Sequence, residues 1–421
     1  MLKRLTITIL AVLPLTFLSG QSRINSPYSR FGLGDIYKNE SSFARTMGGI
    51  GYGIQSSDYV NAKNPASFIG LDSSTFLIDV GYSGFFMSNQ TANQIHSFNY
   101  FNIDYMRVAF PITNWWKVSI GLSPYSMVGY ETETSSILDS VGTIYNNYSG
   151  DGGVNNLSIG NSIRIYKGLS FGFNTSYLFG KLNYRQITSV PDNTNFYQFR
   201  LTNTLDIRNL YFDFGLQHKS HPFKNKDYTL VLGAVFSNQQ KLRSNISTFG
   251  ETYLLTSSGY EYIKDTIVNT LDERGKTVIP MFYGGGFNLQ MSDKWSIGFD
   301  FNQQFWSNYQ SLYQTDTLKN SLSMNIGGSY KIGRFTLRAG ARYYDSYLSL
   351  NDQPIKELGM TFGFSVPLFI DQQSKSYPML DLGAEIGKRG TTDFNLIQQN
   401  YIRVFVGLSI KSIWFNRPKY Y

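Results

Sequence analysis

Apolar and polar residues alternate along most of this chain. Between 335 and 343, Phe, Leu, Ala, Ala and Tyr occupy one face, and the residues between them are Thr, Arg or Gly. A period of two is the side-chain period of a β-strand, so each such stretch predicts a strand with one apolar and one polar face. The polar faces are rich in Gly, Ser and Asn, and the apolar faces end in aromatic residues. This combination is typical of a transmembrane β-barrel, in which the apolar face meets lipid and the polar face meets the lumen.

The alternation predicts fourteen strands, an even number, as a closed antiparallel barrel in an outer membrane requires. The predicted strands span residues 75–86, 98–110, 117–133, 153–167, 169–189, 196–219, 227–249, 277–291, 294–307, 316–332, 335–348, 355–368, 376–389 and 397–412. The predicted fold class is therefore all-β: a transmembrane antiparallel β-barrel of about 14 strands over 75–412, with 413–421 as a periplasmic C-terminal tail.

The connections between these strands fall into two classes. Turns such as 166–168 and 332–334 are short, whereas 134–152 and 250–276 are long. Because outer-membrane barrels have short periplasmic turns and long extracellular loops, we expect the two long connections to be extracellular loops. Several strands exceed the roughly 9 to 11 residues that cross a bilayer, so we expect the wall to rise above the membrane.

Residues 1–22 differ from everything that follows. Lys3 and Arg4 precede an apolar run over 7–18 and then small polar residues at 19–22. This pattern predicts a secretory signal peptide and export to the outer membrane of a gram-negative cell. The alternative is a buried core helix, and Pro14 in the middle of the run and the missing amphipathic period count against it.

Residues 23–74 precede the first strand and do not alternate. A lumen enclosed by fourteen strands is too wide for inward side chains to fill, so we expect this segment to fold inside the barrel as a plug, or hatch. Its glycines allow tight turns close to the wall, and a short helix is expected around 41–47. The candidate plug residues are Arg30, Asp35, Met47, Gly48, Gly49, Asp58, Asn64, Pro65 and Ala66.

Composition narrows the function classes. The chain has 421 residues, no Cys, and only 16% charged residues. The missing Cys excludes a disulfide framework, a thiol nucleophile, a Cys-ligated metal and the lipid anchor of a lipoprotein. The net charge of +8 is not gathered into a basic run, so no nucleic-acid partner is expected.

Side chains for catalysis are scarce. The chain has three histidines, His96, His218 and His221, and none is placed with a Ser and a carboxylate in an alternating strand. His218 and His221 lack a third metal ligand nearby and fit a solvated turn better. The turn at Asp151 offers one carboxylate, far short of a calcium site. We therefore expect no catalytic residue, no metal and no cofactor.

The plug segment carries a resemblance to a known family. The chain resembles the FadL and TodX family of outer-membrane transporters for long-chain fatty acids and aromatic hydrocarbons. The resemblance rests on the glycine-rich stretch 47–53, on Asp58, and on Asn64, Pro65 and Ala66 after it. Pro280 and the glycines at 284–286 add to it. The opening 26–32 and the tail 414–420 resemble a poorly characterised branch of that superfamily. The resemblance implies a plugged barrel that takes up hydrophobic molecules and releases them sideways through a gap in its wall. The sequence does not show the gap.

A set of charged residues is expected to face the lumen: Arg164, Lys294, Asp300, Lys331, Arg338, Arg342, Glu357 and Arg403. The arginines could hold the carboxylate of a fatty acid. Alternatively, they pin the plug to the wall through ion pairs, with Asp300, Glu357, Asp35 and Asp58 as partners, and this interpretation is favoured.

Two functions from different classes follow. The first is passive uptake of small hydrophobic molecules. The second is a barrel subunit that does not transport and belongs to a larger outer-membrane secretion or assembly complex. Partners are then outer-membrane lipid with either a small hydrophobic ligand or other envelope proteins. An apolar tunnel would favour transport, whereas a filled lumen and an apolar patch beyond the lipid belt would favour the subunit.

Overall fold

The computed structural model describes residues 25–139, 141–191, 196–222, 227–256, 259–311, 317–368 and 378–413. The predicted signal peptide and residues 414–421 of the predicted tail lie outside the described residues. Across these ranges, no helix is both long and apolar enough to cross a membrane.

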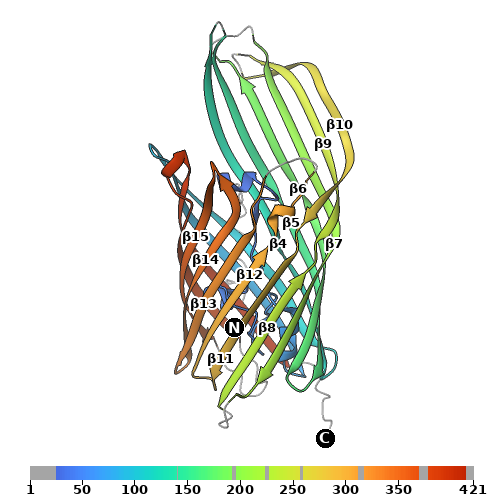
Figure 1. Ribbon diagram of the computed structural model, residues 1–421, viewed down its shortest axis with the longest axis vertical. Coiled ribbons are helices and arrows are strands. Elements are labelled where there is room, and N and C mark those ends of the chain that lie inside the picture. The colour runs from blue at the N-terminus through green and yellow to red at the C-terminus, as the bar shows by residue number, and fades with distance from the viewer. Residues whose placement is uncertain are drawn as a thin grey trace, which may run out of the picture.

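Strands form nearly all of the described chain (Figure 1). They are β1 Asp35–Ile36, β2 Thr75–Gln90, β3 Ile95–Pro111, β4 Trp116–Leu138, β5 Gly142–Tyr166, β6 Leu169–Ser189, β7 Gln198–Ser220, β8 Tyr228–Ser237, β9 Gln240–Leu255, β10 Glu261–Ile279, β11 Phe282–Met291, β12 Trp295–Gln304, β13 Ser321–Ile332, β14 Phe335–Leu350, β15 Gln353–Pro367, β16 Pro378–Arg389 and β17 Gln398–Ile413. The short helices are η2 Pro27–Arg30, α2 Ser42–Arg45, η3 Pro65–Gly70, η4 Trp306–Asn308 and η5 Asp393–Asn395.

The strands from β2 to β17 close into one antiparallel barrel. β7 pairs with both β8 and β9, while β11 pairs with β8 and β10 pairs with β9. β8 with β9, and β10 with β11, thus each act as one interrupted wall strand, and the second interruption contains Pro280, which has no N–H to donate. The described wall therefore has fourteen strands, and the pairing of β17 with β2 closes it. The predicted strand number and fold class are confirmed.

The prediction of two long loops at 134–152 and 250–276 is wrong, because the strands continue through most of these residues. β4 and β5 stay paired up to Leu138 and Gly142, and β9 and β10 stay paired up to Leu255 and Glu261. Strict alternation is lost there because both faces of these strands meet water. In the membrane-spanning part of the wall, by contrast, one face meets lipid. The sequence is still rich in Thr, Ser, Tyr and Val, which favour an extended backbone.

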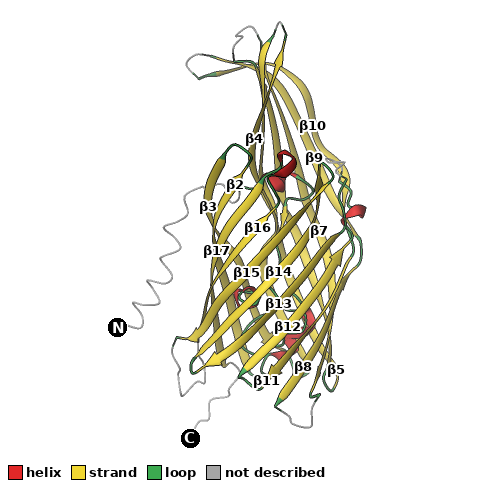
Figure 2. Ribbon diagram, turned by 60° about the vertical axis from the view of Figure 1, so that its left-hand side comes forward, coloured by secondary structure: helices red, strands yellow, loops and turns green. Residues whose placement is uncertain are grey.

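The long strands form an upper sheet that rises above the rest of the barrel on one side (Figure 1). We use this name for the outer ends of β4, β5, β6, β7, β9 and β10, from the cross-strand row Tyr130, Gly150, Tyr184, Asn203, Thr248 and Thr270 upward. Its two edges are β4 and β10. β3 pairs with β4 only from Met106 to Pro111. Beyond the β2–β3 hairpin, β4 therefore has β5 on one side and no strand on the other (Figure 2).

The outward-facing side chains change character below the upper sheet. On β6 and β7, Tyr177 lies opposite Leu210, and four residues further up Lys181 lies opposite Asp206, within 4.0 Å of its carboxylate. Aromatic and aliphatic side chains suit lipid, whereas paired charges suit water. The apolar belt therefore ends between these two rows, and the upper sheet stands beyond it.

Candidate functional site: the plugged lumen

The N-terminal segment, residues 25–74, lies inside the barrel. Ser41 caps α2 by accepting a hydrogen bond from the backbone of Ala44, and the helix ends at Arg45. Beyond the helix, the buried plug residues Met47, Ile50 and Ile54 pack together as a small core. The helix expected around 41–47 is confirmed as a single turn.

Asn64, Pro65 and Ala66 anchor the plug at its end. The Asn64 side chain accepts from the Ala66 N–H at 3.1 Å and donates to the Tyr52 carbonyl at 2.9 Å, while Pro65 begins η3. The wall makes room with glycine: a Cβ on Gly215 would lie 2.0 Å from the Asn64 oxygen. The close fit explains why this element needs small wall residues opposite it.

Met47 and Gly48 press against the wall in the same way. A Cβ on Gly327 would lie 2.2 Å from the Met47 carbonyl oxygen, and one on Gly340 would lie 2.2 Å from the Gly48 nitrogen. Gly48 has a φ of +68°, a conformation that side chains with a Cβ rarely adopt. Its N–H donates to the Thr361 hydroxyl at 2.8 Å.

Asp300 on β12 holds the next turn of the plug. It accepts hydrogen bonds from the N–H groups of Gly51 at 2.6 Å and Tyr52 at 3.0 Å, and it lies 3.4 Å from the Lys63 ammonium. Asp300 is buried. Two backbone donors and one cation compensate a carboxylate that would otherwise be costly to bury.

The other acidic plug residues have cationic partners on the wall. Asp35 pairs with Arg389 at 2.8 Å and Asp58 pairs with Lys411 at 3.1 Å. Neither cation was among the predicted lumenal residues. Both occupy inward positions of an alternating strand, so the same pattern that selected Arg403 could have found them.

Three of the four predicted lumenal arginines are buried, and their acidic partners are on the wall. Arg338 pairs with Asp381 at 3.0 Å, Arg342 with Glu357 at 2.5 Å and Glu385 at 2.6 Å, and Arg403 with Asp104 at 3.2 Å. Of the predicted pairings, only Arg342 with Glu357 is among these, and the expectation that Asp35 and Asp58 serve these arginines is wrong.

The same arginines contact the plug through aromatic side chains. The Arg338 guanidinium lies over the Phe43 ring at 4.4 Å, and Arg403 donates to the Tyr37 hydroxyl at 2.9 Å. From the plug, Arg45 pairs with Asp104. Wall and plug therefore share one buried network of charges and rings.

The structure corrects the prediction for three of the lumenal cations, Arg164, Lys294 and Lys331. Their alternation placed them on inward faces, but all three are exposed. They lie at or beside the short turns, where the strands end and water reaches the side chains. Lys331 lies 4.0 Å from Asp293 in the neighbouring turn. Arg30, predicted for the plug, is the last residue of η2 and is exposed, with its guanidinium 4.9 Å from the centre of the Tyr148 ring.

A gap in the wall between β3 and β4 is covered from within. Where β3 leaves β4, β1 pairs with β4 through Asp35 with Met127 and Ile36 with Ser126. Just above, the Ser26 N–H donates to the Gly129 carbonyl at 2.8 Å. We call residues 25–37 the strap, because they lie along β4 where β3 is missing.

The lumen above the plug is filled by apolar side chains. Tyr28 and Leu33 of the strap belong to one buried cluster with residues of the upper wall, including Leu182, Trp306 and Tyr347. The Trp306 and Tyr347 rings stack with centroids 4.5 Å apart.

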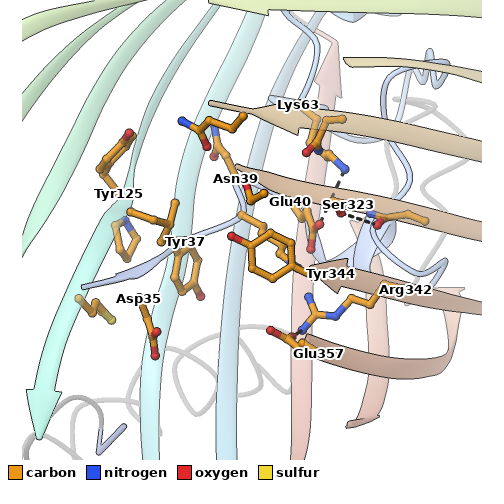
Figure 3. Close-up of a pocket in the computed structure, with 18 of the residues that line it drawn as sticks. Asp35, Tyr37, Asn39, Glu40, Lys63, Tyr125, Ser323, Arg342, Tyr344 and Glu357 are labelled. Carbon is orange, nitrogen blue, oxygen red and sulfur yellow. Dashed lines mark hydrogen bonds and ion pairs between the residues drawn. The ribbon is translucent and has the colours of Figure 1, made fainter. Parts of the chain in front are cut away.

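Below this cluster lies a cavity of about 330 Å³, lined by aromatic and aliphatic as well as charged side chains (Figure 3). Asp35, Glu40, Lys63, Arg342 and Glu357 reach it from the plug and the wall. Lys38 lines it too, with its ammonium 4.6 Å from the Tyr344 ring centre and no hydrogen-bond partner among the described residues. Burial, followed by the nearby Arg342 charge, lowers the pKa of Lys38 to about 8.

Metal and nucleophile chemistry find no support here. Within the described ranges, no three His, Asp or Glu side chains are grouped closely enough to hold a metal ion. The His221 ring lies 3.1 Å from the Tyr228 carbonyl in an exposed turn.

Comparison with solved structures gives the class of protein. The Pseudomonas putida toluene transporter TodX is 16% identical, with 90% of this chain and 99% of that chain covered and a TM-score of 0.56. A Pseudomonas aeruginosa FadL homologue is 12% identical, with 89% and 98% covered and a TM-score of 0.56. The Ralstonia pickettii toluene transporter TbuX is 12% identical, with 88% and 98% covered and a TM-score of 0.57. The chain is an outer-membrane β-barrel with the FadL fold.

The sequence comparison is more specific. The model of the BamG family matches residues 1–421, so the chain belongs to the BamG family. No curated protein sequence matches it.

Proposed function

We propose that this barrel is a subunit of the outer-membrane β-barrel assembly machinery, BAM, and that it acts by docking rather than by transport. The observation that carries this proposal is the exposed apolar surface of β10, formed by three residues of the upper sheet and by Leu271 directly below its lowest row. Tyr262, Ile263, Ile267 and Leu271 are 68%, 54%, 58% and 71% exposed. Because the sheet stands beyond the apolar belt, lipid does not cover these side chains, and exposed apolar patches in water mark protein contacts.

The filled lumen supports the same proposal. The apolar cluster around Tyr28 and Leu33 occupies the upper lumen, and charged side chains such as Lys38, Glu40 and Arg342 reach the cavity beneath it. A hydrophobic solute would have to displace the cluster and would take water from the charged groups of the cavity. Family membership supports a BAM partner, since the matching family is BamG.

We also propose that the lumenal arginines hold the plug instead of a ligand carboxylate. Each guanidinium of Arg338, Arg342 and Arg403 already has a protein carboxylate within 3.2 Å. A fatty acid would compete with those buried pairs. In this role the network keeps the strap and plug fixed beneath the upper sheet.

The docking proposal is tested by affinity purification from native membranes in mild detergent, followed by native mass spectrometry. We expect the wild-type protein to be recovered with BAM components. The double variant Ile267→Asp with Leu271→Asp should lose at least tenfold of that recovery while the barrel stays folded. The matched control, Thr266→Asp with Thr270→Asp on the same strand, should retain it.

Recovery of the wild-type barrel alone, or equal recovery of both double variants, would contradict docking through β10. Heat-modified migration on gels, which reports barrel folding, must be the same in all three proteins for the comparison to hold.

Uptake of small hydrophobic molecules is the second candidate, and the opening between β3 and β4 favours it. If the strap moved away from Met127 and Gly129, the lumen would connect to the membrane there. Uptake of radiolabelled oleate or toluene by cells that lack the gene, with and without a plasmid copy, tests this. Faster uptake with the plasmid would support transport.

A further inference from the structure

A groove of about 820 Å³ crosses the outer wall where β15, β16, β17, β2 and β3 lie side by side. It is on the face of the barrel opposite the lumen, and Tyr401 and Met87 line both the groove and the lumenal cavity. Its floor includes Gly359 and Gly387, which are cross-strand partners and present no side chain.

One row of the groove is apolar. Met360, Ile386, Ile402 and Phe86 are successive cross-strand partners on four neighbouring strands. All four point outward and are 45% to 58% exposed. In an outer-membrane barrel such a row faces the acyl chains of lipid.

The next outward row, nearer the hairpin ends, is polar. Lys388 lies beside Leu358 on one side and Asn400 on the other, and Ser88 and Ser97 follow on β2 and β3. Lys388 is exposed, and neither of its cross-strand neighbours is acidic. An ammonium at the edge of an apolar surface lies at the depth of the lipid headgroups.

We propose that this groove binds a lipid with an anionic phosphate headgroup. Its acyl chains would lie along Met360, Ile386 and Ile402, and its phosphate would contact the Lys388 ammonium, with the Asn400 amide and the Ser88 hydroxyl as further donors. Charge complementarity selects this occupant, because a neutral apolar partner would leave Lys388 uncompensated.

The end of the barrel fixes which leaflet supplies the lipid. The polar row lies near the β14–β15, β16–β17 and β2–β3 connections, at the same end as the upper sheet. Outer-membrane barrels place their taller end outside. The lipid therefore comes from the outer leaflet, as a phosphorylated glycolipid such as lipid A.

Native mass spectrometry of the detergent-purified barrel tests the proposal. Lipid A, phosphatidylglycerol and phosphatidylcholine are added separately at equal concentration, and the retained lipid is measured. We expect the wild-type protein to retain lipid A at least fivefold more than phosphatidylcholine, whose choline neutralises its phosphate. Stronger retention of phosphatidylglycerol than of lipid A would overturn the assignment to lipid A.

Two variants separate charge from shape. Lys388→Gln should bring anionic retention down to the phosphatidylcholine level, whereas Lys241→Gln, an exposed lysine on β9, should leave it unchanged. Ser97→Trp should fill the groove and lower retention of every lipid. Equal retention of the three lipids by the wild type, unchanged retention by Lys388→Gln, or occupation of the groove by a co-purified protein would overturn the proposal.

Discussion

The carboxylate of Asp300, on the barrel wall, lies 2.6 Å from the backbone nitrogen of Gly51, in the plug. The two residues are 249 positions apart in the chain, and the contact ties a glycine turn of the plug to β12. Lys63 neutralises the same carboxylate from within the plug. This one side chain thus fixes the depth of the plug inside the wall.

Replacing Asp300 should loosen the plug. Asp300→Asn keeps the shape but removes the charge that Lys63 faces, and breaking a buried charge pair costs about 3 kcal/mol. Hydrogen exchange of the amides at 48–53 should become faster, and the barrel should unfold at lower denaturant concentration. The matched control is Asp293→Asn, because Asp293 lies in an exposed turn before the same strand. Equal exchange in both variants would show that Asp300 is not an anchor.

A methyl group on Gly340 should push the plug away from the wall. Its Cβ would lie 2.2 Å from the Gly48 nitrogen, and neither a backbone nitrogen nor a Cβ, which is fixed directly to the backbone, can turn aside. We expect Gly340→Ala to destabilise the folded barrel by about 1 to 3 kcal/mol, as overpacking does. Denaturant midpoints measured in detergent check this. Gly285→Ala is the control, since the nearest neighbour of its Cβ would be the Gly233 carbonyl oxygen at 3.7 Å. A similar midpoint for the two variants would contradict the close packing.

Lys38 should make stability depend on pH. Its pKa is about 8 in the folded protein and 10.5 in its ordinary state, so the unfolded chain binds more protons between these two pH values. Stability therefore rises from pH 8 to pH 10.5, by up to about 3 kcal/mol at 1.36 kcal/mol per pH unit. Below pH 8 both states carry the charge and the full cost of burying it persists.

The comparison of wild type with Lys38→Met isolates this effect from other titrating groups. The difference in unfolding free energy should shrink as pH rises from 8 to 10.5, with the variant more stable at the lower pH. A difference that stays constant over this range would show that Lys38 keeps its ordinary pKa.

The strap should be linked to β4 by a designed crosslink. The chain has no cysteine, so Ile36→Cys with Ser126→Cys introduces the only two thiols, at positions that are direct cross-strand partners. We expect near-complete crosslinking on mild oxidation, read as a shift in gel migration. Ile36→Cys with Thr132→Cys places the second thiol about 20 Å further along β4 and should not crosslink. Equal crosslinking of the two pairs would mean that the strap does not rest on β4.

The lumenal charges show how far sequence reasoning reaches. Alternation correctly placed Arg338, Arg342 and Arg403 in the buried interior, because facing is a local property of a strand. It could not assign their partners, because Asp381, Glu385 and Asp104 come from strands whose register with the arginines is set by the closed sheet. It also placed Arg164, Lys294 and Lys331 inward without showing that the strands end there.

The sequence by itself determined the fourteen-strand closed barrel and set apart, ahead of the first strand, a segment without alternation that contains Asn64, Pro65 and Ala66. These depend on a period of two and on turn chemistry, which neighbouring residues decide among themselves. Only the tertiary structure decided the upper sheet, the strap over the gap between β3 and β4, and the glycine contacts at Gly215 and Gly340. Each of these depends on which distant strands are neighbours and on how closely their backbones approach, and neither is encoded in the alternation of any single strand.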